Sequence, residues 1–251
     1  MSHHIILHEL AANNTDRFSP FCWRTRWGLA HKGLTFESSS IPFPRIGELG
    51  GKNKTVPAIQ VGGTYVEDSW AIAEFLDEHF PERPPLFGCA IGKGTARFVE
   101  CFTDKVIHPT ILKLIAEDVF YRLTPEDQLY FRRTREEMLG TTLELAQQGR
   151  DALVQSFRKA IHPIRLTLLK QPWLSGDEPG HADYIVLAAF QWARLASPFK
   201  ILMEDDPIFE WFQRGLELHD GFGKKYHPSA GGLGFASPTA AHEVAEICKT
   251  T

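Results

Sequence analysis

The chain has 251 residues, of which 43% are hydrophobic and 23% charged, and its formal net charge is −4. Such a composition is ordinary for a globular protein, and the length suffices for one large or two small domains. The slight acidity disfavours a nucleic-acid partner or an anionic membrane surface. No apolar run approaches the roughly 20 residues that a membrane-spanning helix requires, so we expect no membrane partner.

The termini and the cysteines indicate the compartment. The N-terminus, MSHHIILHEL, has no basic n-region and no small-residue cleavage site, so we predict no signal peptide. The four cysteines have unrelated spacings and do not form a disulfide framework. A reducing compartment agrees with this pattern, and we expect a cytoplasmic protein.

The first 85 residues alternate between strand and helix patterns, in the order βαβ and then ββα. Two short apolar runs joined by Gly62-Gly63 predict an antiparallel hairpin, and the first three elements predict a parallel strand pair with a crossover helix. We expect strands at residues 5–9, 34–39, 56–61 and 64–67, helices at 21–32 and from 69 onward, and an irregular segment at 42–53.

The rest of the chain has helical patterns only. The segment PERPP, residues 81–85, is typical of a linker, so we expect an α/β domain over residues 1–85 and a helical domain over 93–227. Pro109 and Pro163 are expected to kink or break their helices. A tail rich in Gly, Ala, Ser and Pro, residues 228–251, is expected to be loosely ordered. The expected helical runs are 95–116, 125–148, 151–169, 182–195 and 207–218.

The sequence RFSPFCWR, residues 17–24, opens the first predicted helix and carries the most specific chemistry. Ser19 occupies the N-cap position and Pro20 the first helical position, as both residue types prefer. A helix N-terminus stabilises an anion and lowers the pKa of a thiol placed there. Because position 19 carries a hydroxyl, we expect this site to hold the thiolate of a ligand.

Cys22 allows two interpretations. The pattern Ser19-Pro20-Phe21-Cys22 is a CxxC redox motif with serine in place of the first cysteine, so Cys22 could exchange disulfides. However, the reactive thiol of such motifs is normally the first one, and Cys22 lies one turn into the helix, where a buried cysteine is inert.

Two further motifs lie near the predicted hairpin. Pro57 opens a strand, and a cis bond after Val56 would turn the Val56 N–H and C=O groups toward a bound peptide; an ordinary strand-edge proline is the alternative. Asp68 and Ser69 precede a helix, where they are good caps. They could also hold the ammonium and carboxylate groups of a free amino-acid end.

These motifs resemble those of one family. SPFCWRTRWGLAHKGL, KTVPAI and EDSWAIAEFLDEHFPERPPLF, followed by WLSGDEPGHADY, are similar in order and spacing to glutathione transferases. The resemblance covers residues 5–225 and is greatest to the bacterial β-aryl etherases of lignin breakdown (the LigE type) and the related fungal etherase-like class (FuA). It implies an α/β thioredoxin-like N-terminal domain followed by an all-α C-terminal domain.

The resemblance also implies site residues. Ser19 matches the serine that hydrogen-bonds the sulfur of glutathione, the co-substrate. Val56 matches the residue whose backbone pairs with the glutathione cysteine, and Asp68 and Ser69 match the pair that holds the γ-glutamyl end. Lys52, or alternatively Lys54, is expected to meet the glycyl carboxylate.

The remaining candidates concern the second substrate, an aromatic small molecule. Phe21, His108 and Tyr121 are expected to line its pocket, and Phe18 and Phe120 are further aromatic candidates. His3, His4 and His8 lack a fourth ligand, so we predict no metal site. Asp183 resembles the acid of a helix capping box in the family, with Gly180 in place of the usual hydroxyl.

The sequence therefore predicts a glutathione transferase that forms a homodimer, as the resemblance implies. Ser19 would stabilise the glutathione thiolate for attack on an aromatic electrophile, including the carbon that bears the aryloxy group of a β-aryl ether. Two alternatives remain at this stage. One is a glutathione-dependent thiol/disulfide oxidoreductase that uses Cys22, and the other is a non-catalytic protein that binds aromatic ligands.

Overall fold

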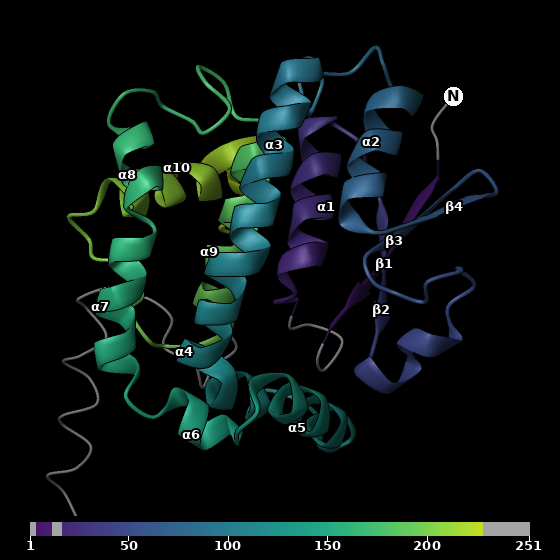
Figure 1. Ribbon diagram of the computed structural model, residues 1–251. Coiled ribbons are helices and arrows are strands. Elements are labelled where there is room, and N and C mark those ends of the chain that lie inside the picture. Colours follow the sequence, from purple (N-terminus) through teal and green to yellow (C-terminus); the bar gives the residue numbers. More distant parts are fainter. Residues whose placement is uncertain (1–3, 12–16, 228–251) are drawn as a thin grey trace, which may run out of the picture.

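The protein is described by a computed structural model, which places residues 4–11 and 17–227 (Figure 1). The tail predicted over residues 228–251 lies outside the described residues. The chain folds into an N-terminal α/β unit and a larger group of helices, and one continuous hydrophobic core includes residues of both.

The N-terminal unit is a four-stranded mixed sheet with two long helices. Its elements are β1 (Ile5–Leu10), α1 (Pro20–His31), β2 (Glu37–Ile41), the 3-10 helix η1 (Phe43–Glu48), β3 (Ala58–Val61), β4 (Thr64–Glu67) and α2 (Ser69–His79). The strand order is β2-β1-β3-β4, in which β1 and β2 are parallel and the other neighbours antiparallel. The predicted βαβ-ββα order is confirmed.

Most of helix α1 is buried, whereas Phe21 in its first turn is 40% exposed. The helix packs against α2 and, on the other side, against α9 of the helical unit, so it lies between the sheet and that unit (Figure 1). Trp23 and Trp27 are fully buried there. Ser19 caps its first turn and Pro20 is its first residue, whereas Gly33 follows its end with φ +62°, the left-handed conformation that glycine adopts most readily.

The second strand begins three residues later than predicted. The N–H of Leu34 donates to the carbonyl of Leu29, at 3.0 Å, and this bond closes the end of α1. Residues 34–36 therefore complete the helix terminus, and pairing with β1 begins only at Glu37. The segment predicted to be irregular contains η1, which contacts the helical unit.

The helical unit contains eight α-helices among the described residues. They are α3 (Ala90–Phe102), α4 (His108–Phe120), α5 (Pro125–Leu139), α6 (Leu143–Gln147), α7 (Arg150–Ala160), α8 (His162–Leu168), α9 (His181–Ala196) and α10 (Pro207–Gly221). A π-helical turn, η2 (Thr103–Ile107), joins α3 to α4. No described helix is both long and apolar enough to cross a membrane.

Proline and glycine divide the predicted helical runs. The run over 125–148 ends at Gly140, which has φ +67°, before Thr142 caps α6, and the run over 151–169 is interrupted at Ile161, just before Pro163. Pro109 does not break its helix. Its missing N–H would have bonded the carbonyl of Lys105, which lies inside the π-helical turn.

Helix α9 is the centre of the helical unit, and each of its residues is buried. Asp183 accepts hydrogen bonds from the N–H groups of Leu174, Ser175 and Gly180, and from Nε1 of Trp211. A Cβ on Gly180 would lie 2.7 Å from the Ser175 hydroxyl and 3.0 Å from the Leu86 carbonyl oxygen. Glycine therefore replaces the usual capping hydroxyl because a side chain does not fit.

Candidate functional site

A cavity of about 750 Å³ lies between the two units. One wall comes from the start of α1, from η1 and from the segment before β3, and the other comes from α4, α5 and Trp192 of α9. Of the residues that the sequence predicted for the site, Ser19, Phe21, Lys54, Val56 and His108 all line this cavity.

Ser19 lies where the N-terminus of α1 meets the cavity. The side chain is buried, with 6% of the residue exposed, and its Oγ accepts a hydrogen bond from the N–H of Cys22 at 3.4 Å. This bond uses an oxygen lone pair and leaves the O–H proton available. A negatively charged ligand atom in the cavity would thus meet a hydroxyl donor and the positive end of the helix dipole.

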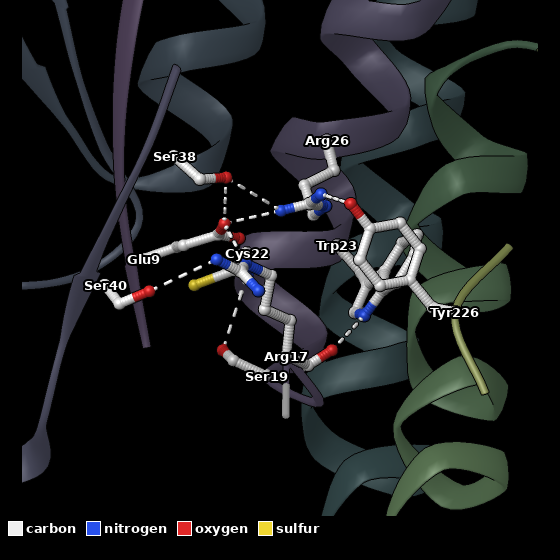
Figure 2. Close-up of polar contacts among 9 residues, drawn as sticks. All are labelled: Glu9, Arg17, Ser19, Cys22, Trp23, Arg26, Ser38, Ser40 and Tyr226. Carbon is white, nitrogen blue, oxygen red and sulfur yellow. Dashed lines mark hydrogen bonds and ion pairs between the residues drawn. The ribbon is translucent and has the colours of Figure 1, made fainter. Parts of the chain in front are cut away.

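A buried ion-pair network fixes the segment that leads into α1 (Figure 2). Glu9 on β1 is fully buried, and its Oε1 accepts from Nε of Arg17 at 2.8 Å, from Arg26 at 2.5 Å and from the Ser38 hydroxyl at 2.6 Å. The carbonyl of Arg17 accepts from Nε1 of Trp23 at 2.6 Å. These bonds fix the position of Arg17, and Ser19 follows it by only two residues.

The same network extends to the last described part of the chain. Arg26 also donates to the hydroxyl of Tyr226, and its guanidinium lies 4.6 Å from the centre of that ring (Figure 2). The sequence motifs did not predict this network. Glu9 is the single acid in the apolar strand IILHEL and could have indicated it. A carboxylate buried in such a strand requires cationic or N–H partners.

Cys22 is buried beneath Ser19. Burial, reinforced by the charge of Glu9, raises the pKa of the Cys22 thiol to about 12. Only the thiolate is a good nucleophile, so a thiol with this pKa is almost entirely unreactive at neutral pH. Burial and the raised pKa of Cys22 therefore disfavour the oxidoreductase alternative.

The bond between Val56 and Pro57 is cis, and Val56 lines the cavity. Lys54 and Thr55 line it as well, whereas Lys52 does not. Of the two lysines considered for an anionic group, the structure therefore places Lys54 at the cavity and Lys52 outside it.

Glu67 organises the segment that carries these lysines. Its carboxylate accepts from the N–H groups of Asn53 at 2.8 Å and Thr55 at 3.3 Å. A Cβ on Gly51 would collide with this carboxylate, so a side chain at position 51 would displace Glu67 from these N–H groups. Burial raises the pKa of Glu67, but the backbone N–H groups of residues 52–55 outweigh it and hold the pKa below its ordinary value.

Asp68 and Ser69 begin α2 next to the cis-proline. The N–H of Asp68 donates to the Pro57 carbonyl at 3.3 Å, and Asp68 has φ +78°. Its Oδ1 accepts from the N–H groups of Trp70 and Ala71, both at 3.0 Å, which confirms its capping role. Asp68 is exposed and Ser69 is buried, and neither lines the cavity itself.

His108 and Phe21 form the join between the two walls. Their rings meet edge to face with centroids 5.1 Å apart, and His108 also contacts Trp192. The Nδ1 atom of His108 lies 3.3 Å from Oδ1 of Asp104, while its buried Nε2 has no hydrogen-bond partner among the described residues. Burial lowers the pKa of His108, so the imidazole is neutral at neutral pH.

Two of the predicted aromatic wall residues lie elsewhere. Tyr121 follows the end of α4, is 67% exposed and packs against Phe120, with the centroids 5.4 Å apart. Neither residue lines the cavity, whereas Phe18 does. The helix ends before Tyr121, so its side chain does not continue the inward face of α4. Pocket residues that the sequence did not indicate are Phe43, Tyr130, Phe131 and Arg135.

Comparison with known proteins identifies the family. The model of the glutathione S-transferase N-terminal domain matches residues 18–79, and the model of the glutathione S-transferase C-terminal domain matches residues 95–204. The chain belongs to the glutathione S-transferase family. Glutathione is the co-substrate of this family, and the thioredoxin-like N-terminal domain with a helical C-terminal domain, as predicted, is confirmed.

Individual relatives agree with this assignment. The chain is 29% identical over 208 residues to the glutathione S-transferase-like protein ustS of Aspergillus flavus, covering 68% of this chain and 72% of that one. It is similar to the crystal structure of glutathione transferase GSTFuA3 from Phanerochaete chrysosporium, with 26% identity, a TM-score of 0.71 and coverage of 90% and 95%. A glutathione complex of CsGST63524 from Ceriporiopsis subvermispora shares the fold, with 22% identity, a TM-score of 0.71 and coverage of 94% and 100%.

These transferases bear on the predicted subclass. The similarity to the FuA class is supported by the structure from Phanerochaete chrysosporium. The similarity to bacterial β-aryl etherases stays a prediction.

Proposed function

We propose that this glutathione transferase binds glutathione in the half of the cavity next to α1 and uses Ser19 to stabilise its thiolate for attack on an aromatic electrophile. One observation carries the proposal. The capped N-terminus of α1 and the cis Val56–Pro57 bond face the same cavity, whose opposite wall is largely aromatic and aliphatic.

The glutathione half offers one partner for each part of the tripeptide. The Val56 backbone would pair with the cysteinyl residue, and Lys54 would meet the glycyl carboxylate. The hydroxyl of Ser69, which begins α2 just outside the cavity lining, would hold the γ-glutamyl carboxylate. Oδ1 of Asp68 makes both capping bonds, so Oδ2 can accept from the ammonium group of the ligand.

The energetic demand on Ser19 is small. A free thiol of this type has a pKa near 8.5, and lowering it by one unit requires about 1.4 kcal/mol. One hydrogen bond to a charged group supplies about 1.5–3 kcal/mol, and the helix dipole adds to it. Ser19 therefore needs to act only as a donor to the sulfur, not as a base.

For a β-aryl ether, the thiolate would attack the carbon that bears the aryloxy group. The C–S bond forms as the C–O bond breaks, and the aryloxide leaves and takes a proton from water. His108 lines this half of the cavity together with Phe21 and Trp192.

The test is incubation of the purified protein with glutathione and a panel of β-aryl ethers and aryl halides, with analysis for the thioether product. Thioether from at least one electrophile supports the proposal. Binding of aromatic ligands with no thioether from any member would favour the non-catalytic alternative. Glutathione-dependent disulfide reduction that is lost on Cys22→Ser would favour the oxidoreductase alternative.

We also propose the homodimer that the family suggests. Ile91 and Phe98 lie seven residues apart on one face of α3 and are 82% and 73% exposed. Large hydrophobic side chains that are exposed together on one helix face are typical of a protein–protein interface. Light scattering coupled to gel filtration should give twice the monomer mass, and a monomer at micromolar concentration would contradict it.

A further inference from the structure

The far half of the cavity contains a guanidinium group without an acidic partner. Arg135 on α5 lines the cavity and is half-buried. Its only hydrogen bond among the described residues is to the Thr134 hydroxyl, at 2.9 Å, and it forms no ion pair there. A desolvated cation without a counter-ion is costly, and an arginine cannot relieve this cost by losing its proton.

The charges that line the cavity do not balance. Among the described residues that line it, three cations, Lys54, Lys113 and Arg135, face one carboxylate, Asp104. Asp104 is already bound by Arg24, at 2.5 Å, and lies beside His108. Even if Lys54 binds glutathione, two cations remain in the half that takes the second substrate. This surplus of positive charge belongs to the cavity lining, whereas the chain as a whole has a net charge of −4.

Aromatic rings surround the guanidinium. It lies 5.6 Å from the ring centre of Phe43 and 5.2 Å from that of Phe131, and Tyr130 stacks on Phe43 with centroids 5.6 Å apart. These contacts hold the planar group against the cavity wall, where its parallel N–H groups match the two oxygens of a carboxylate. The same rings offer apolar surface to an aromatic ring that carries such a group.

We propose that the electrophilic substrate is an aromatic carboxylate, and that Arg135 binds its carboxylate, with Lys113 as a second cation in the lining of the same cavity. This inference rests on the proposed function, because it assigns the second substrate of that site. Arg135 is accordingly a specificity-determining residue, and it takes no part in the activation of the thiol.

Two glutathione conjugates test the inference without any dependence on turnover. S-(4-carboxybenzyl)glutathione carries the proposed anion, and S-(4-carbamoylbenzyl)glutathione is its neutral isostere. Their dissociation constants would be measured by titration calorimetry with the wild-type protein and with Arg135→Gln, Arg135→Lys and Arg133→Gln. Arg133 is the matched control, because it is exposed on the same helix and does not line the cavity.

The wild-type protein is expected to bind the carboxylate conjugate about 10- to 100-fold more tightly than the amide, as one charged hydrogen-bonded pair would give. Arg135→Gln should remove this preference, Arg135→Lys should keep part of it, and Arg133→Gln should keep all of it. Equal affinities for the two conjugates, or an equal loss for both in Arg135→Gln, would overturn the inference. Failure of free glutathione to bind would overturn the proposed function itself, and this inference with it.

Discussion

The backbone N–H of Phe43 donates a hydrogen bond of 2.8 Å to Oδ1 of Asp127, and this bond ties η1 of the first domain to α5 of the second. Asp127 is buried, and its Oδ2 accepts from the Thr124 hydroxyl at 2.9 Å at the N-terminus of α5. Phe43 and Phe131 line the cavity on the two sides of this link. One carboxylate therefore binds the N-cap hydroxyl of α5 and joins the two walls of the site.

Asp127→Ala should lower the free energy of unfolding by about 1–3 kcal/mol, because a buried N–H loses its acceptor and the Thr124 hydroxyl that caps α5 loses the carboxylate it donates to. Asp151→Ala is the control, since Asp151 is an exposed acid in the first turn of α7 and should change stability by less than about 0.5 kcal/mol. Denaturant unfolding measures both. Equal effects of the two substitutions would contradict the role of Asp127.

Glu67→Gln should loosen the segment that carries Lys54 and weaken glutathione binding with little change in kcat. The pKa of Glu67 lies below its ordinary value in the folded state, because four backbone N–H groups outweigh the opposing effect of burial. Its stabilising contribution is therefore complete above about pH 4.3, the ordinary value for glutamate, and is lost as the pH falls through the lower folded value.

Unfolding measured between pH 7 and pH 3 tests the sign. The wild-type protein should be more stable than Glu67→Gln at pH 7, and the difference should shrink only below about pH 4. Glu78→Gln, at an exposed position on α2, is the control and should match the wild type. A stability difference between the wild type and Glu67→Gln that grows as the pH falls would contradict the proposed role of Glu67.

Cys22 should not react with a thiol reagent in the native protein. With a pKa of about 12, only about one thiol in ten thousand is ionised at pH 8, and the group is also buried. Cys89 and Cys101 are exposed and should be labelled, as mass spectrometry of digested protein would show. Labelling of Cys22 as fast as of these two, or loss of thioether formation in Cys22→Ala, would contradict this view.

The sequence predicts the fold well because local signals and topology agree. The serine–proline start of α1, the two-glycine hairpin turn and the strand order each have a local physical cause. The helix breaks were harder to place. Pro163 indicated the break at Ile161, whereas the apolar spacing continues across Gly140 and the sequence prediction placed no break there.

The candidate site was partly predictable. Ser19 and Val56 lie in motifs whose spacing defines their place, whereas Lys52 and Lys54 share a loop in which only the contacts of Glu67 decide which lysine faces the cavity. Tyr121 lies one residue past the end of α4. Whether its side chain faces the cavity depends on where the helix ends, so a small error in that boundary changes the prediction. Arg135 resembles any solvated charge on α5 until η1 packs opposite it.

The pKa of glutathione bound to the protein shows whether Ser19 stabilises the thiolate. It would be measured by thiolate absorbance against pH for the wild type, for Ser19→Ala and for Ser39→Ala, a β2 serine that does not line the cavity. We predict that the pKa of the bound thiol rises by about one unit in Ser19→Ala only, with a parallel loss of thioether formation and a modest loss of affinity. An unchanged pKa and rate in Ser19→Ala would contradict the account.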